Sequence, residues 1–268
     1  MPSKSTTEET LSIGIQLRDL VVEYAPGKPV LQNLTQDIFS GEIVACVGAS
    51  GCGKSTLLRA IAKLIPLRSG SIVLHPNSLT RPPNNIAYVF QDATLLPWRT
   101  VAENVKLPFE LGRAASRKVK ATSASDQHME IKSVLETVGL SADDAGKFPR
   151  ELSGGMRMRV SLARAIVTSP SILLLDEPFA ALDDLLRSKM NDLVLQLQQS
   201  GQQTVLFVTH NIAEAVFLSH RVFVLGDGKI CRTLNNPLAF PRSPEIRSSL
   251  EFAEFYGRIS HALAEVSP

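Results

Sequence analysis

The sequence predicts an α/β fold, in which a mostly parallel sheet core carries an antiparallel β layer and an inserted α-helical subdomain. Three observations predict this fold. Apolar strand patterns alternate with helical patterns in the C-terminal half, two alternating strand patterns joined by a turn stand near the N-terminus, and helical patterns dominate from Ala93 to about Arg159. Hydrophobic residues make up 44% of the 268 residues and charged residues 20%, so a substantial core can form.

The N-terminal part contains five strand patterns. The first two alternate in polarity and are joined by the turn Ala25–Pro29, which is typical of an antiparallel layer. The third is apolar throughout and leads through a glycine-rich segment into a helical pattern, Ser55–Ile61. The predicted strands are Ile13–Tyr24, Leu31–Phe39, Glu42–Val47, Ser71–Leu74 and Ala87–Gln91.

The middle and C-terminal parts predict helices and further strands. Met129–Val138 is the clearest helix of the middle block, and the Ser-rich, basic segment Gly112–Gln127 indicates a linker. The alternation that follows predicts right-handed crossovers in a parallel sheet. Its strands are Ser171–Leu175, Thr204–Val208 and Arg221–Leu225; its helices are Leu182–Gln199 and Ile212–Leu218, and a terminal helix is predicted at Ile246–Leu263.

The glycine-rich segment between strand and helix meets the phosphate-loop pattern at every constrained position. Its glycines let successive N–H groups turn toward phosphate oxygens, and the helix N-terminus adds a partial positive charge. Lys54 would bridge the β- and γ-phosphates of a nucleoside triphosphate, and Ser55 would complete the coordination of Mg²⁺. A chance glycine-rich turn is the alternative. The nucleotide-binding candidates are Gly48, Ala49, Ser50, Gly51, Cys52, Gly53, Lys54, Ser55 and Thr56.

Polar residues follow three other predicted strands, at the sheet edge where ligands bind in parallel α/β folds. Asp176 would hold Mg²⁺, and Glu177 would polarise the attacking water as a general base. His210 could hydrogen-bond the γ-phosphate and orient that water. Gln91 could reach Mg²⁺ or water through its amide oxygen. Taken singly, each has an ordinary alternative, such as an acidic turn or a surface histidine.

A second anion-binding helix N-terminus is predicted at Leu152–Arg159. Ser153 is a natural N-cap, and Gly154 and Gly155 expose backbone N–H groups. Because a helical insertion would hold this segment away from the phosphate loop of its own chain, a second copy could present it to a shared nucleotide.

Together these motifs resemble the ATP-binding subunits of ABC transporters, from about Ile13 to Leu225. The resemblance implies a P-loop NTPase (RecA-like) core, with ATP and Mg²⁺ as cofactors. It implies an ABC ATPase domain at 12–240, in which 12–92 and 160–230 form the β layer and core and 93–159 the helical subdomain. A flexible tail at 1–11 and a helical extension at 241–268 flank that domain. The implied sites are the phosphate loop at Gly48–Ser55, the glutamine loop at Gln91, the signature at Leu152–Met156, the magnesium and base residues Asp176 and Glu177, the dimer-contact loop Ala181–Asp183, the switch histidine His210 and the adenine-stacking Tyr24.

One residue departs from the family pattern, because Met156 stands where a glutamine is usual. Ser153 and the backbone amides can bind γ-phosphate without that side chain, so activity is still expected. Met156 and the segment Leu95–Val101 resemble importer ATPases for nitrate, sulfonate, taurine or bicarbonate. Trp98 is expected to contact a permease helix, with packing inside its own subdomain as the alternative.

The resemblance implies a homodimer that closes on ATP beneath integral membrane permease subunits and works indirectly with an extracytoplasmic solute-binding protein. The absence of an apolar run of roughly 18 residues predicts a peripheral location, at the cytoplasmic face of the inner membrane. A DNA-repair or chromosome-organising ATPase needs a coiled-coil insertion or a basic face, and the net charge of +2 gives no electrostatic case for nucleic acid. A nucleotide sensor without turnover is the other alternative.

Three cysteines, Cys46, Cys52 and Cys231, show no metal-like spacing and favour a reducing cytoplasm. Cys52 lies in the phosphate loop beside a helix N-terminus, where a thiolate is expected to be somewhat favoured. It is either a redox-sensitive site or a small residue at a variable loop position.

Overall fold

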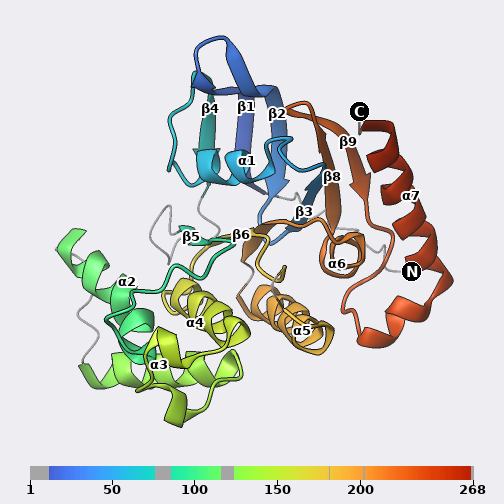
Figure 1. The fold of residues 1–268 in the computed structure, drawn as a ribbon. Helices are drawn as coiled ribbons and strands as arrows, with labels where there is room; N and C mark the ends of the chain where they lie inside the picture. The colour runs from blue at the N-terminus through green and yellow to red at the C-terminus, as the bar shows by residue number, and fades with distance from the viewer. Residues whose placement is uncertain (1–11, 76–85, 116–123, 181, 202, 267–268) are drawn as a thin grey trace, which may run out of the picture.

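A six-stranded sheet and a three-stranded sheet organise the computed structural model, which describes residues 12–75, 86–115, 124–180, 182–201 and 203–266 (Figure 1). The predicted tail at 1–11 and Ala181 of the predicted dimer-contact loop lie outside the described residues.

The larger sheet forms the core. Its order is β5-β6-β7-β3-β8-β9, and neighbouring strands are parallel except that β9 is antiparallel to β8. Every residue of β6 and β7 is buried, which explains their continuous apolar sequences. The mostly parallel α/β sheet predicted from the sequence is therefore confirmed. The strands are β3 (Ile43–Gly48), β5 (Ile86–Val89), β6 (Ile172–Asp176), β7 (Thr204–Val208), β8 (Arg221–Gly226) and β9 (Lys229–Asn235).

The smaller sheet is the antiparallel layer, in the order β2-β1-β4. Its strands are β1 (Ile13–Ala25), β2 (Lys28–Phe39) and β4 (Ser69–Leu74). Helix α1 (Lys54–Ile61) lies between this layer and the larger sheet, where its buried Leu57 and Leu58 belong to one apolar cluster with side chains of both sheets. This packing fixes the start of α1, and with it the phosphate loop.

Three helices lie to one side of the sheets (Figure 1). They are α2 (Val101–Ala115), α3 (Ala124–Thr137) and α4 (Gly154–Ile166), with short 3₁₀ helices at Ala142–Asp144 and Pro149–Glu151 between the last two. The linker predicted at Gly112–Gln127 is too long, because α2 continues to Ala115 and α3 begins at Ala124; residues 116–123 lie outside the described residues. Alanines at these helix ends favour helix, and the Ser-rich, basic composition obscured that preference.

The C-terminal helices and α4 cover the face of the larger sheet that lies opposite α1. Helices α5 (Asp184–Gly201) and α6 (Ile212–Leu218) are followed by a 3₁₀ helix, Pro244–Ser248, and by α7 (Leu250–Val266). The predicted terminal helix is therefore divided in two. Phe255 and Ile259 anchor α7 in the core. No helix in the described ranges has the length and apolar character that crossing a bilayer requires.

Buried Arg242 ties this C-terminal part to α6. Its guanidinium donates hydrogen bonds to the carbonyl oxygens of Val216, Phe217 and Ser219 at 2.8 to 3.0 Å and to that of Leu238 at 2.8 Å. A cation at a helix C-terminus satisfies carbonyls that have no partner within the helix. Arg242 thus fixes the end of the helix that begins directly after His210.

Candidate active site

Four neighbouring strands of the larger sheet bring most of the predicted site residues to one edge. The phosphate loop follows β3, Gln91 follows β5, Asp176 and Glu177 end β6, and His210 follows β7. They surround a cavity of about 370 Å³. The residues that line it are Ser50, Gly51, Gly53, Lys54, Ser55, Thr56, Gln91, Glu177 and His210.

The phosphate loop depends on backbone conformations that only glycine adopts easily. Gly51 and Gly53 have φ of 80° and 107°, in the left-handed region, and Gly53 is the N-cap of α1. A Cβ atom on Gly48 would lie 2.3 Å from the carbonyl oxygen of Leu225. Buried Lys54 donates hydrogen bonds from Nζ to the carbonyl oxygens of Gly48 and Ala49, at 2.9 and 2.8 Å. The loop therefore presents a helix N-terminus and a cation together, which suits a phosphate chain.

The Asp176 carboxylate is held at both of its oxygens. Ser55 Oγ donates a hydrogen bond to Asp176 Oδ1 at 2.7 Å, and Tyr88 Oη donates one to Oδ2 at 2.9 Å. A hydroxyl and a carboxylate this close form an oxygen donor pair of the kind that Mg²⁺ prefers. Within the described ranges no three His, Cys, Asp or Glu residues form a metal-binding group. A cation beside Ser55 and Asp176 could take further ligands from Gln91, which lines the same cavity, and from the nucleotide and water.

Glu177 and His210 meet across the ends of β6 and β7. Glu177 Oε2 lies 3.1 Å from His210 Nδ1, and Glu177 N donates a hydrogen bond to the carbonyl oxygen of Val208 at 3.1 Å. The φ of Glu177 is 46°, a left-handed conformation that is costly for a residue other than glycine. The His210 side chain is 66% exposed, which leaves it free to turn toward a ligand.

Tyr24 lies at the rim of this region, at the end of β1. It is 60% exposed, and its hydroxyl is 3.4 Å from Thr56 Oγ1. The position beside the phosphate loop leaves much of the ring open to stack on a base.

The second predicted anion site belongs to the N-terminus of α4. The Ser153 hydroxyl accepts a hydrogen bond from Met156 N at 3.2 Å, as expected of an N-cap, and Ser153 and Gly154 are exposed. A Cβ atom on Gly155 would lie 2.6 Å from Leu186 Cδ2, so a larger residue would require the Leu186 side chain to shift. The described residues that line the phosphate-loop cavity include none of these three.

Sequence reasoning missed three residues of this region, Tyr88, Arg187 and Glu214. The Glu214 carboxylate is buried, accepts a hydrogen bond from Thr209 Oγ1 at 2.6 Å and lies 3.3 Å from Arg187 Nε. Arg187 also donates to the carbonyl oxygen of Leu182 at 2.8 Å. This ion pair connects α5, which follows the loop after Glu177, to α6, which follows His210. A glutamate at the third position of an otherwise apolar helix, four residues after His210, was the available signal.

Two sequence predictions concerning side-chain environments are settled by the structure. Burial raises the pKa of the Cys52 thiol, and the nearby Lys54 charge opposes this only in part. The expected preference of Cys52 for the thiolate is therefore wrong, because desolvation outweighs the helix N-terminus. Trp98 is 71% exposed, so packing inside its own subdomain is wrong as well.

Comparison with known proteins adds sequence evidence to this geometry. The family model described as ABC transporter matches residues 31–180. A putative ATP-binding protein of Brucella abortus biovar 1 (strain 9-941) is 39% identical over 256 residues, which is 95% of each chain. An aliphatic sulfonates import ATP-binding protein, SsuB of Albidiferax ferrireducens, is 41% identical over 243 residues, covering 91% of this chain and 82% of the relative.

Solved structures share the fold. The ATP-binding cassette MJ0796, in a dimeric post-hydrolysis state bound to ADP and Pi, matches with a TM-score of 0.74 and 30% identity over 84% of this chain and 100% of that one. CbiO1 of Clostridium perfringens, which is part of the cbiONQ transporter complex, matches with a TM-score of 0.71 over 94% of this chain and 99% of that one. At 24% identity this second likeness concerns the fold alone.

Proposed function

The chain belongs to the ABC transporter family as an ATP-binding subunit, and on this premise we propose that it hydrolyses ATP to drive import of a small anionic solute through a separate permease. The single observation that carries the hydrolysis is the contact between Glu177 and His210 at the cavity of the phosphate loop. A binding protein without turnover would not need a carboxylate and an imidazole there.

The residues of the cavity divide the chemistry among them. Lys54 and the N-terminus of α1 bind the phosphate chain, and Tyr24 stacks on adenine. Ser55 and Asp176, assisted by Gln91, would hold Mg²⁺, and the bound ion would supply positive charge that neutralises the phosphate chain. Glu177 accepts a proton from the attacking water as general base. His210 keeps the Glu177 carboxylate oriented and contacts the γ-phosphate.

A second copy of the chain completes each site. Exposed Ser153 and Gly154 leave the N-terminus of α4 available to a nucleotide bound by a partner. This geometry supports a head-to-tail homodimer with two ATP molecules between the subunits. The dimeric MJ0796 cassette supports it further, since that relative is 30% identical to this chain.

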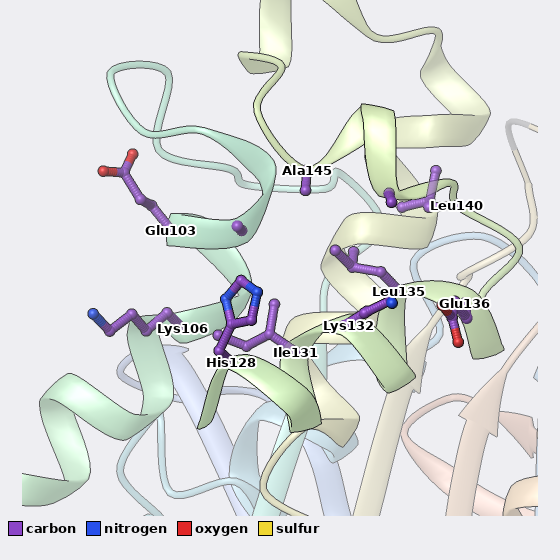
Figure 2. Close-up of a pocket in the computed structure, with 11 residues that line it drawn as sticks. Glu103, Lys106, His128, Ile131, Lys132, Leu135, Glu136, Leu140 and Ala145 are labelled. Atoms are coloured by element: carbon purple, nitrogen blue, oxygen red, sulfur yellow. The ribbon is translucent and has the colours of Figure 1, made fainter. Parts of the chain in front are cut away.

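The permease contact is proposed at the helical side of the molecule. Trp98 is exposed on the loop before α2, and the first turn of α2 lines an apolar cavity of about 220 Å³ (Figure 2). Ile131 and Leu135 of α3 line the same cavity, whereas Lys106 and other charged residues lie around it. An amphipathic permease helix fits such a surface, with an apolar side chain in the cavity and polar groups at the rim. The subunit would then sit at the cytoplasmic face of the inner membrane.

The solute class rests on the relatives. The Albidiferax relative is described as importing aliphatic sulfonates, and we extend this to sulfonate, taurine, nitrate or bicarbonate as candidate solutes for this chain. A solute-binding protein outside the membrane would deliver the anion to the permease.

Uptake by reconstituted vesicles tests this function. The chain is co-purified with its permease and placed in vesicles, with ATP on the side of the membrane that carries the chain. The binding protein and each labelled anion are supplied on the other side. Accumulation of one anion that requires ATP is the expected result. ATP hydrolysis without accumulation of any anion would reject the importer assignment, and the absence of hydrolysis would reject the enzyme assignment.

A further inference from the structure

Tyr88 contacts the proposed metal ligand Asp176, but the proposed function gives Tyr88 no role. It lies on β5, the neighbour of β6, and its hydroxyl donates a hydrogen bond to Asp176 Oδ2 at 2.9 Å. The Ser55 hydroxyl donates to the other oxygen, Oδ1, at 2.7 Å. Asp176 is 2% exposed, so water does not readily replace either partner. The plane of this carboxylate is therefore set by two hydroxyl groups on opposite sides.

The Tyr88 side chain is itself held in position. Its ring packs on Phe90 with 4.4 Å between the ring centroids. The Arg59 side chain lies close to the Tyr88 hydroxyl. Arg59 follows Ser55 by four residues on α1, which places both residues on one face of that helix.

Arg59 is exposed on α1 and places a positive charge near the Tyr88 hydroxyl. The hydrogen bond from Tyr88 to Asp176 is the contact that fixes Oδ2. A phenylalanine at position 88 would preserve the ring and lose only this hydrogen bond.

We propose that Tyr88 is a positioning residue for the divalent cation, which acts by holding Asp176 Oδ2 and leaving Oδ1 directed toward the cation beside Ser55. The inference rests on the proposed function, because it requires Asp176 to be the carboxylate that holds Mg²⁺. Residues that orient a metal ligand typically contribute 10- to 100-fold to metal affinity, although they never touch the ion. Tyr88 has the geometry of such a residue.

The test is the affinity for Mn²⁺, used in place of Mg²⁺, in the presence of a non-hydrolysable ATP analogue. Free Mn²⁺ is measured by electron paramagnetic resonance for the wild type, Tyr88→Phe and Asp176→Asn. Tyr88→Phe is expected to weaken Mn²⁺ binding on the order of tenfold. Binding of the analogue in EDTA is expected to stay unchanged, which a general disturbance of the fold would not allow. Tyr256→Phe, which removes a hydroxyl from an exposed tyrosine of α7, is the matched control and is expected to bind Mn²⁺ as the wild type does.

The outcomes separate this inference from the function on which it rests. If Asp176→Asn abolishes Mn²⁺ binding while Tyr88→Phe leaves it unchanged, Asp176 is supported as a metal ligand and the proposed role of Tyr88 is overturned. If Asp176→Asn binds Mn²⁺ like the wild type, the metal assignment itself fails and the role of Tyr88 fails with it.

Discussion

Glu177 Oε2 and His210 Nδ1 are 3.1 Å apart, so a carboxylate at the end of β6 is hydrogen bonded to an imidazole at the end of β7. The two strands are direct neighbours in the sheet, and Asp176 pairs with Val208 in their register. The contact therefore follows from strand register rather than from a flexible loop.

Glu177→Gln is expected to slow ATP hydrolysis on the order of 10²- to 10⁴-fold, because an amide cannot accept the proton of the attacking water. ATP binding should be preserved, since the amide keeps the size and the hydrogen-bonding oxygen of the side chain. Steady-state phosphate release and equilibrium binding of labelled ATP check both parts. Glu254→Gln, an exposed position on α7, is the control and should hydrolyse ATP normally. A Glu177→Gln variant that hydrolyses ATP at the wild-type rate would show that another group is the base.

Ser153→Arg is expected to abolish dimerisation driven by ATP. The arginine side chain is larger than serine and would fill the space at the N-terminus of α4 where the nucleotide of the partner binds. Sizing chromatography with and without ATP, in a variant background that does not hydrolyse it, measures the dimer fraction. Ser260→Arg adds the same charge at an exposed position of α7 and should dimerise normally. A normal dimer fraction for Ser153→Arg would contradict the sandwich arrangement.

Trp98→Ala is expected to leave ATP hydrolysis by the isolated chain intact and to reduce its co-purification with the permease. The side chain is 71% exposed, so its loss should change the free energy of unfolding by about 0.5 kcal/mol or less. Leu250→Ala removes an equally exposed apolar side chain from α7 and serves as the control. Equal recovery of permease with all three proteins would exclude Trp98 as an anchor.

Asp144 is expected to make the protein sensitive to acid. Hydrogen bonds from Lys147 Nζ and from Ser141 lower the pKa of its carboxyl from 3.8 to about 2. Because the pKa is lower in the folded state, the stabilisation is present above pH 4 and is lost as the pH falls toward 2. Asp144→Asn should therefore lower stability at pH 7 and flatten its decline between pH 4 and 2. Urea unfolding across this range, with exposed Asp143→Asn as control, measures the effect; parallel curves for both variants would refute it.

Arg221→Met is expected to destabilise the fold by about 3–5 kcal/mol, because it leaves the Glu42 carboxylate buried without its partner. The Arg221 side chain is 14% exposed and that of Glu42 is 8% exposed, and they form two hydrogen bonds. Arg18→Met breaks the half-exposed pair with Asp37 and should cost about 1 kcal/mol or less. Urea unfolding compares the two variants. Similar losses of unfolding free energy in both variants would show that burial does not determine how much each ion pair contributes to stability.

Continuous apolar patterns made much of the core predictable. The bounds of β7 and α6 agree with the sequence prediction at both ends, because each is a short, mostly apolar segment bounded by polar residues. Strand β9 was not predicted. Five of its seven residues are exposed and its alternation is weak, so only its pairing with β8 makes it a strand.

The site was partly predictable for a similar reason. Glu177 and His210 follow apolar strands, and the order of parallel strands brings such ends together. Tyr88 was not predictable, because a tyrosine inside a strand usually indicates β propensity and nothing more. Its contact with Asp176 depends on the pairing of β5 with β6, two segments more than eighty residues apart. The role of Arg242 was not predictable either, because the sequence does not indicate which backbone carbonyl oxygens a side chain will bind.

The left-handed backbone of Glu177 has a consequence for selection. Gly and Asn adopt φ near 46° more readily than Glu does, so each should gain stability at this position while the reaction is lost. Laboratory evolution that rewards heat resistance alone is therefore expected to replace Glu177 early. Evolution that also rewards transport should keep it and gain heat resistance elsewhere.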